Sequence, residues 1–433
     1  MKSINLSILL LLTFFQVTSV AQDAALLYLK GSIPGTFINP ALTLDKNVNI
    51  SLAGIKAQVS TDGPSISNIT SNNSSGNKYI DVKKNSEKLS PYHNISANLD
   101  VHTLDIGIKA GPIILMAGHG FRSSANVRYP KGLIEIAAKG NAPFWGQKVN
   151  IGTAVDVLAY NELYLGAQTN VGNFSVGCKG KLLYGTANLR SERSNVLFQT
   201  KPEFYQLELE TDYLIRSSGL LRYQALDSIT LNYAPFTFDN LFYNNRGYAF
   251  DIGATLKIGQ KWLLSASALD IGSIAWDFFP RKYSSKGTFT FEGVDLLDFL
   301  GDSTSIAVTD TLLEIVKVQS TLENYTTKLN SRYTLGCAYD MDDKWSFFAL
   351  YMMNRNFGYA SHHLSVSALR KFSFLHLGLN YSISENNYAS FGIFGKINAG
   401  PFSAYIQSEN IAGLFRPFGS KNAGVRLGTT LQF

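Results

Sequence analysis

Segments of about ten residues in which every second residue is apolar recur through most of the chain. From Tyr248 to Ile258 the even positions are all apolar or aromatic, whereas the odd positions include Asp251, Thr255 and Lys257. Successive side chains point to opposite faces of a strand, so each segment predicts one apolar and one polar face. Tilted strands of this length cross a bilayer, and an apolar outside with a polar inside is typical of transmembrane β-barrels.

The pattern therefore predicts an all-β fold, a transmembrane antiparallel up-and-down β-barrel of about 14–16 strands over residues 47–433. The larger count has strands starting near Asn47, Ile95, Ile113, Lys148, Glu162, Asn173, Glu203, Arg246, Lys261, Ser331, Lys344, His362, Phe374, Tyr388, Phe402 and Asn422. Tiny turns such as Gly111-Pro112 and Asn161 alternate with long connections such as Arg122–Gln147, and Ser191–Lys201 is a turn of middling length. Short periplasmic turns and longer outer loops produce this alternation, and fourteen strands preserve it almost as well as sixteen.

The first 21 residues have the features of an export signal. Lys2 precedes an apolar stretch from Ile8 to Phe15, and small residues follow at Ser19 and Ala21, which predicts cleavage after Ala21. The apolar stretch is too short for a membrane anchor, and no later run of 18 apolar residues occurs. We therefore expect residues 1–21 to be a signal peptide and the cell outer membrane to be the location.

Residues 22–46 are too long to serve only as a leader into the first strand, and we expect them to form a plug segment. They hold the turn Asn39, Pro40, Ala41, where Pro40 cannot donate a ladder hydrogen bond and biases Asn39 away from helix. The apolar residues around this turn need a dry partner, and the periplasmic mouth of the barrel is the nearest one. Those residues are Leu26, Leu27, Tyr28, Ile33 and Phe37.

Charged residues make up only 16% of the chain, against roughly 25% in a typical soluble domain. The net charge of +6 comes from scattered Lys and Arg, so no nucleic-acid partner is expected. The polar strand faces instead predict charged side chains inside the barrel, which either line a pore, hold the plug or form stabilising ion pairs. The predicted lumen-lining polar residues are Asp156, Lys179, Lys181, Glu208, Glu210, Asp212, Asp251, Lys257 and Arg426, with Arg370 and Lys396 in the same phase.

The opposite phase predicts the side chains that face lipid. Ile252, Leu256, Leu207 and Leu427 are expected to point outward. Cys178 and Cys337 share the apolar phase of two separate strands, so we expect free thiols rather than a disulfide.

Two loop segments carry a helical pattern. Thr311 to Glu314 resembles a capping box and is followed by apolar residues at helical spacing, which predicts a helix from about Leu312 to Leu329. A shorter helix is expected from Pro130 to Lys139. The tripeptide Asp-Ile-Gly occurs at Asp105, Asp251 and Asp270 without a fixed period, and we attribute it to lumen positions or strand ends.

Several stretches resemble a family of outer-membrane β-barrel proteins of unknown function, related to the long-chain fatty-acid-transporter barrels. They are Gly35 to Ala41, Gly172 to Gly185, Arg246 to Thr255 and Trp262 to Trp276. The resemblance spans most of the mature chain. It implies a barrel in outer-membrane lipid, an N-terminal segment that plugs the lumen and a small apolar ligand. The C-terminal strand, which ends in Phe433, resembles the signal that barrel-assembly machinery reads.

The search for catalytic chemistry finds no GxSxG, HExxH or P-loop motif, and the adjacent His362 and His363 would point to opposite faces of a strand. We expect no catalytic residues, no metal site and no cofactor. Three functions stay open. The first is passage of a small apolar molecule across the outer membrane, and the second is a structural or docking barrel for surface export or assembly machinery. An outer-membrane enzyme is the least expected.

Overall fold

The protein is described here from a computed structural model, which covers residues 26–65, 70–72, 78–80, 89–202, 206–219, 221–225, 228–231, 241–291, 318–356, 359–384, 387–408, 410–415 and 419–433. The expected signal peptide lies outside the described residues, as does the first part of the expected loop helix, Leu312 to Lys317.

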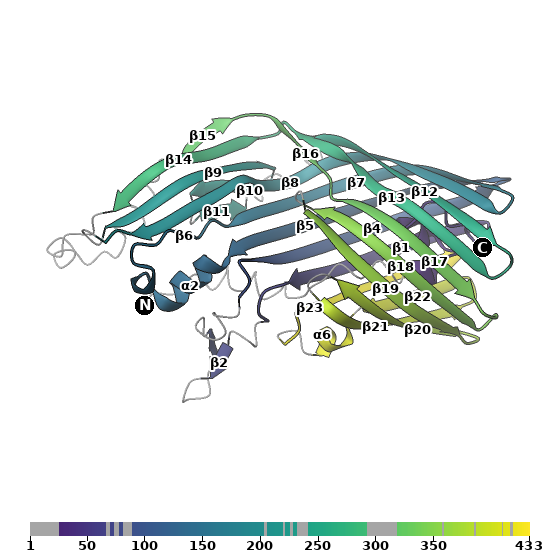
Figure 1. The fold of residues 1–433 in the computed structure, drawn as a ribbon. Helices are drawn as coiled ribbons and strands as arrows, with labels where there is room; N and C mark the ends of the chain where they lie inside the picture. Colours follow the sequence, from purple (N-terminus) through teal and green to yellow (C-terminus); the bar gives the residue numbers. More distant parts are fainter. Residues whose placement is uncertain are drawn as a thin grey trace.

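The strands close into a barrel of 14 antiparallel strands, which confirms the predicted fold (Figure 1). Lipid offers no partner for an open sheet edge, and closure removes every edge. The last strand pairs back with the first. The order around the barrel is β1 (Val48–Thr61), β4 (Tyr92–Ala110), β5 (Ile113–Pro130), β7 (Ala154–Val171), β8 (Phe174–Thr200), β12 (Arg246–Ile258), β13 (Trp262–Trp276), β17 (Ser331–Asp340), β18 (Trp345–Asn356), β19 (Tyr359–Lys371), β20 (Leu375–Ser384), β21 (Asn387–Ala399), β22 (Phe402–Ser408) and β23 (Asn422–Gln432).

Part of the sheet continues beyond the barrel as an extension. Strand β8 has 27 residues: its first half pairs with β12, and its second half pairs with β9 (Leu207–Gly219). Strand β9 then pairs with β14 (Arg281–Phe291), and β14 pairs with β15 (Gln319–Leu322). Short β6 (Val149–Asn150) pairs with the far end of β8, and β16 (Tyr325–Lys328) pairs with the end of β13.

The extension explains why the larger strand count is wrong. Two expected turns do not exist, because β7 runs through Asn161 and β8 runs to Thr200. Strand β8 has one extra residue, Thr186, opposite the step from Ala159 to Tyr160 in β7, and another, Glu192, in its pairing with β9. Bulges interrupt the apolar–polar alternation, so the single long strand β8 looks like a strand and a turn in the sequence.

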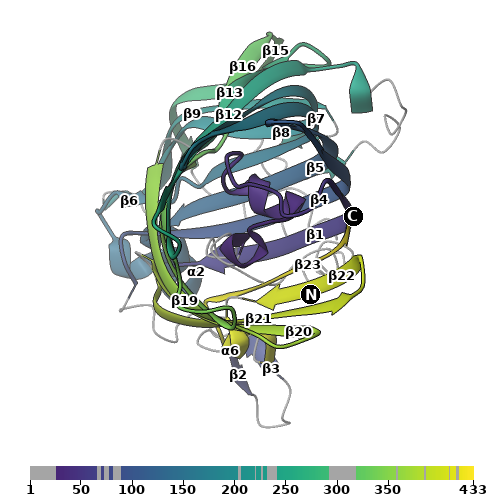
Figure 2. The same cartoon turned by 90° about the vertical axis from the view of Figure 1, so that its right-hand side faces the viewer.

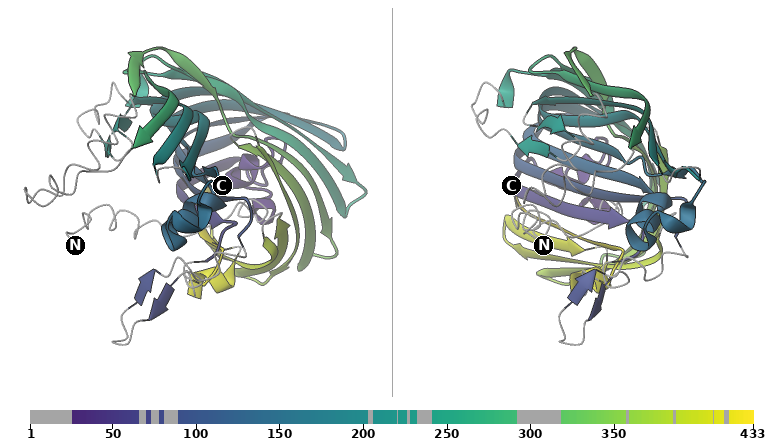
Figure 3. Two further views of the ribbon diagram at one scale, coloured as in Figure 1. Left: turned by 60° about the vertical axis from the view of Figure 1, so that its left-hand side comes forward. Right: turned by 90° about the vertical axis from the view of Figure 1, so that its left-hand side faces the viewer.

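The two ends of the barrel differ. Tight turns with positive-φ glycines, among them Gly111, Gly172, Gly259 and Gly400, gather at the end on the right of Figure 1, which we call the short-turn end. The opposite, long-loop end carries α2 (Lys131–Lys139), α6 (Ile411–Phe415) and the 3-10 turn Ala142–Phe144, together with two small hairpins (Figure 3). The hairpins are β2 (Thr70–Asn72) with β3 (Lys78–Ile80) and β10 (Leu221–Ala225) with β11 (Ser228–Leu231).

The helix expected from Pro130 to Lys139 is confirmed, since α2 covers Lys131–Lys139. The expected helix from Leu312 to Leu329 is wrong over its later part, because Gln319–Leu322 and Tyr325–Lys328 are strands. There, pairing with β14 and β13 outweighs the helical spacing of the leucines. Within the described ranges, no helix is both long enough and apolar enough to cross a membrane.

Side chains of the barrel wall point alternately outward and inward, as the sequence pattern predicts. Ile252, Leu256 and Leu427 are exposed on the outside, Leu207 on β9 is partly exposed, and Asp251 and Arg426 are buried inside. Both cysteines are free thiols, with Cys178 exposed and Cys337 partly exposed.

Candidate functional site: the N-terminal segment and the lumen

The N-terminal segment, residues 26–46, lies inside the barrel near the short-turn end. Figure 2 looks into that end and shows the segment in purple, coiled within the ring of strands. The segment includes the 3-10 turn η2 (Ile33–Phe37), whose residues are all buried. Leu26 and Ile33 have no exposed surface, and they belong to one apolar cluster with wall residues such as Met116, Phe348 and Phe394. The dry partner that the apolar residues require is therefore the inner wall of the barrel.

The Asn39-Pro40-Ala41 turn is seated on the wall by side-chain and backbone contacts. The Asn39 amide donates to the carbonyl oxygens of Ala254 at 3.1 Å and Ala266 at 3.0 Å, and its oxygen accepts from the Ala41 N–H at 2.8 Å. A Cβ atom at Gly177 would meet the Pro40 carbonyl, and one at Gly253 would meet the Asn39 side chain. Bare glycine backbone in the wall makes room for this turn.

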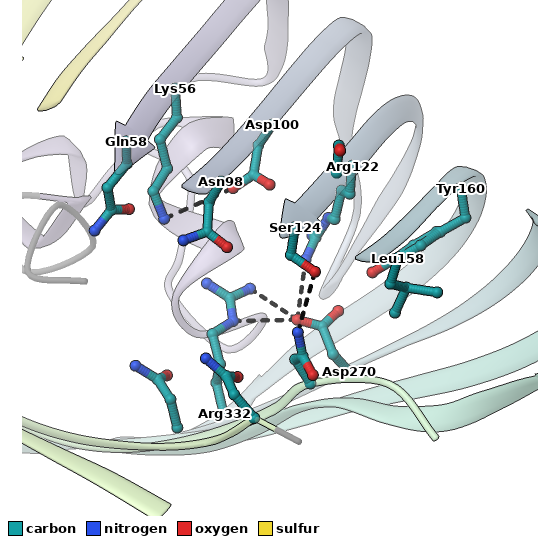
Figure 4. A pocket seen from close by; sticks show the side chains of 14 residues that line it. Lys56, Gln58, Asn98, Asp100, Arg122, Ser124, Leu158, Tyr160, Asp270 and Arg332 are labelled. Atoms are coloured by element: carbon teal, nitrogen blue, oxygen red, sulfur yellow. Dashed lines mark hydrogen bonds and ion pairs between the residues drawn. The ribbon is translucent and has the colours of Figure 1, made fainter. Parts of the chain in front are cut away.

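Above the segment, six charged side chains meet across the lumen, and we call them the lumen charge cluster: Arg122, Glu162, Lys181, Asp251, Asp270 and Arg332. Asp270 is its centre (Figure 4). Its carboxylate lies 2.5 Å from Lys181 Nζ, 2.9 Å from Arg122 Nη1 and 3.0 Å from Arg332 Nη2. Arg122 also pairs with Glu162 at 3.0 Å, and Lys181 with Asp251 at 2.8 Å. Three positive and three negative side chains balance, as buried charges require.

The position of Asp270 depends on a bulge in β13. Phe250 pairs with Ile271 and Ile252 with Ala268, so both Leu269 and Asp270 lie opposite Asp251. Asp270 has φ of 58°, a left-handed conformation that Asp tolerates better than most side chains, and its N–H donates to Asp251 Oδ1 at 2.7 Å. The bulge lets two consecutive side chains, Leu269 and Asp270, both be buried.

Lys179 connects the segment to this part of the lumen. Its ammonium donates to the Thr36 carbonyl at 3.1 Å and the Thr36 hydroxyl at 3.0 Å, and lies 4.5 Å from the Tyr164 ring centroid and 4.9 Å from that of Phe37. The Tyr164 hydroxyl donates to the buried Asp105 at 2.8 Å. The cation is thus shared between segment backbone and aromatic faces.

The structure separates the remaining predicted lumen residues. Asp156 is buried against Arg190, which it binds through two hydrogen bonds of 2.8 and 3.0 Å. Glu208, Glu210 and Asp212 lie on β9 in the extension, where they pair with Lys201, which is partly exposed, and with Lys148 and Arg193, which are exposed. Arg426 is buried on β23 opposite Lys56 of β1.

Two lysines of the predicted inward set lie at the short-turn end. Lys257 and Lys396 line a cavity there, of which Lys257 is exposed. Arg370, in the same predicted phase, lies instead over the rings of Trp345 and Phe372 and is exposed.

Sequence reasoning missed four members of the lumen charge cluster: Arg122, Glu162, Asp270 and Arg332. Arg122 was expected at the start of a loop, whereas β5 continues to Pro130, and Glu162 was expected at a strand start that does not exist. For Asp270, the repeated Asp-Ile-Gly tripeptide was the available signal. The first two copies of the tripeptide, at Asp105 and Asp251, place an Asp and a Gly on the inner face. Gly107 lies against Ile33 and Leu44, and Gly253 lies against Asn39.

Around the residues that the structure describes, cavities occur at three places along the lumen. Beside the charge cluster is a small one of about 80 Å³, lined by Lys56, Asp100, Arg122, Asp270 and Arg332 among other polar residues. At the long-loop end, between barrel rim and extension, is one of about 680 Å³, which we call the outer vestibule. The third, beside the N-terminal segment at the short-turn end, has about 570 Å³. A separate apolar groove of about 640 Å³ lies on the wall at Leu104, Leu163, Leu165 and Leu182, whose side chains are exposed on the outside.

Within the described part of the chain, no group of three or more His, Cys, Asp or Glu could hold a metal ion. The buried carboxylates near the charge cluster are occupied by Arg, Lys and Tyr partners. The arrangement places a layer of balanced charges next to an apolar segment inside the barrel.

Comparison with known proteins finds one family and several solved structures. Residues 40–409 match a family described as a family of unknown function (DUF5723). Among solved structures, the Ralstonia pickettii toluene transporter TbuX is 8% identical with a TM-score of 0.45, covering 92% of this chain and 93% of its own. A Pseudomonas aeruginosa FadL homologue is 10% identical with a TM-score of 0.41, covering 96% and 99%. The Pseudomonas putida toluene transporter TodX is 8% identical with a TM-score of 0.41, covering 96% and 94%. No curated protein matches the chain.

Proposed function

Because the chain belongs to a family of unknown function (DUF5723), we propose its function from geometry: it is an outer-membrane barrel that passes a small molecule, and residues 26–46 form the plug. The observation that carries the proposal is the seating of this segment. It packs inside the lumen at one end, beside a cavity of about 570 Å³, while the outer vestibule of about 680 Å³ lies at the other end.

The contacts that hold the plug are individually weak and are not covalent. Ser267 donates to the Ile38 carbonyl at 2.6 Å, Gln168 donates to the Ala41 carbonyl at 3.0 Å, and Lys30 pairs with Asp340 at 2.6 Å. Single hydrogen bonds of this kind contribute about 0.5–1.5 kcal/mol net. Such a segment is held firmly by the sum of its contacts, and it can be displaced in steps.

The cargo has two candidate routes. The resemblance implies an apolar molecule, and the apolar groove on the outer wall supports that proposal, because it offers a ligand-sized surface in the lipid-facing band. The cavities along the lumen are lined mostly by polar residues. A molecule that crosses between the vestibule and the plug therefore replaces its bound water with contacts to polar side chains. We therefore propose that an apolar molecule would bind in the groove on the outer wall. A molecule that passes along the barrel axis would be hydrophilic.

The test is deletion of Leu26–Thr36, which removes the first part of the plug and leaves β1 intact. We expect a folded, heat-modifiable barrel whose conductance in planar bilayers exceeds that of the full mature chain. The control is Lys30→Ala, which removes one ion pair and leaves the apolar plug in place. Unchanged conductance on deletion would contradict the proposal, because the lumen would then be closed without the plug.

A docking barrel for surface export or assembly machinery is the second candidate, and the extension favours it. A bilayer needs strands of about 9–11 residues, whereas β8 has 27 and carries β9 and β14 beside it. A sheet held outside the membrane is a surface for a partner. Deleting the tip of the extension should abolish partner capture and leave conductance unchanged if docking is the function.

Location and assembly belong to the same proposal. The outward band around Ile252 and Leu427 suits outer-membrane lipid, and β23 closes the barrel against β1. We propose that barrel-assembly machinery reads this terminal strand together with the exposed Phe433 that follows it. Recovery of the protein in a soluble periplasmic fraction would overturn the location.

A further inference from the structure

The outer vestibule contains an arginine, Arg128, whose guanidinium contacts two tyrosine rings. The Arg128 guanidinium carbon lies 4.5 Å from the Tyr92 ring centroid and 4.5 Å from the Tyr359 ring centroid. Tyr92 and Arg128 come from the neighbouring strands β4 and β5. Tyr359 comes from β19, which is seven places from β5 in the ring of 14 strands and so lies on the opposite wall. The contact of Arg128 with Tyr92 and Tyr359 therefore spans the mouth of the lumen.

Among the residues that the structure describes, no carboxylate neutralises the charge of Arg128. Two other charged residues of the vestibule are matched: Arg190 by Asp156, and Glu192 by Arg216 at 2.8 Å. Among the described residues, neither Arg128 nor Lys328, which also lines the vestibule, forms an ion pair with a carboxylate. Two tyrosine rings contact the Arg128 guanidinium, and the side chain also lines the vestibule, where a ligand can reach its N–H groups.

We propose that the outer vestibule binds a small hydrophilic solute through a carboxylate or phosphate group at Arg128, with Lys328 as a second cation. A guanidinium is planar and presents paired N–H donors that match an oxyanion at two points. The rest of the lining, Ser191, Ser194, Asn195 and Thr326, supplies hydroxyl and amide groups suited to a hydroxylated body such as a sugar.

The charges of the other lumen cavities agree with an anionic solute. The small cavity beside the charge cluster has three cations, Lys56, Arg122 and Arg332, against Asp100 and Asp270. The cavity beside the plug has five lysines against Asp45 and Asp340. Cavities lined by an excess of one charge concentrate solutes of the opposite charge. The site deepens the proposed passage, but binding at Arg128 can be measured without passage.

The experiment uses the mature protein in detergent and saturation-transfer NMR with glucuronate, glucose 6-phosphate and uncharged glucose. We expect saturable signals from glucuronate or glucose 6-phosphate and none from glucose. Arg128→Gln should raise the apparent Kd at least tenfold, and Arg128→Lys, which keeps the charge and loses the fork, should raise it less. Lys328→Gln should raise it a few-fold.

The matched control is Arg355→Gln, because Arg355 is exposed on β18 near the same end of the barrel and does not line the vestibule. Its binding should equal that of the unmodified protein. Equal binding of glucose and glucuronate, or an Arg128→Gln variant that binds as tightly as the parent, would overturn the site. If the plug deletion raises conductance but the binding results overturn the site, the proposed passage is kept and only the anion site is rejected.

Discussion

Replacing Asp270 with Asn should destabilise the barrel more than any exposed charge change. Asn keeps the size of the side chain and tolerates the left-handed backbone at φ of 58°, so the change is mainly one of charge. The lumen charge cluster would shift from three positive and three negative side chains to three and two. Asp270 is 3% exposed and Lys181 2%, so solvent does not screen the resulting excess charge.

Removing one partner of a buried ion pair costs about 3–5 kcal/mol, because the other charge is left buried and uncompensated. We expect a loss of this size in the free energy of unfolding of Asp270→Asn. The assay is urea unfolding in detergent micelles followed by tryptophan fluorescence, with heat-modifiable migration on gels as a check of folding. The control is Asp212→Asn, since Asp212 pairs with Arg193 at 2.9 Å while both side chains are substantially exposed. Exposed pairs contribute about 0–1 kcal/mol.

A double variant separates charge balance from simple loss of contacts. Asp270→Asn with Lys181→Met restores equal numbers of positive and negative side chains in the cluster, and we expect it to recover about 1–3 kcal/mol relative to Asp270→Asn alone. If the double variant is less stable than the single one, or if Asp270→Asn and Asp212→Asn cost the same, the cluster is not held together by charge balance, and the reasoning fails.

Three further predictions concern the wall and the plug. Ile252→Arg, on the lipid face, should cost about 2–4 kcal/mol and lower the folded yield, whereas Leu322→Arg in the extension should fold as the parent does; equal yields would show that the assigned faces are wrong. Cys178 should react with a lipid-soluble maleimide faster than the less exposed Cys337, and intact mass under non-reducing conditions should show two free thiols; a mass lower by two protons would contradict this. Asn39→Ala removes both hydrogen bonds that Asn39 donates to the wall, so cleavage of residues 26–46 by added protease should become faster while the barrel stays resistant; unchanged cleavage would mean that this turn does not hold the plug.

The barrel itself was predictable because lipid imposes a strict rule. Every wall strand must place apolar residues outside, so Ile252 and Asp251 fall on opposite faces by alternation alone. The same rule fails in β8, where residues beyond Tyr184 belong to the extension and no longer face lipid. That is why Ser191–Lys201 reads as a turn in the sequence and lies within a strand in the structure.

The charge cluster was only half predictable. Lys181 and Asp251 follow the inward phase of two strands, and alternation identifies them. Asp270 does not follow it, because the bulge buries Leu269 and Asp270 together, and no single-residue pattern reveals a bulge. Arg122 required the true length of β5, which depends on its pairing with β4 as far as Pro130.

The plug and the lumen charge cluster contact the same strands. This links the proposed passage past the plug with the proposed binding of an anionic solute. In β12, Asp251 pairs with Lys181 in the cluster, while Gly253, two residues along on the same face, touches Asn39 of the plug. In β4, Asp105 and Gly107 repeat this arrangement, since Asp105 accepts from Tyr164 and Gly107 touches Ile33. An Asp-Ile-Gly tripeptide thus places a carboxylate and a gap on one inner face about 7 Å apart along the strand. Displacing the plug uncovers wall directly beside the cluster, so a solute that leaves the cluster toward the short-turn end meets the space that the plug vacates.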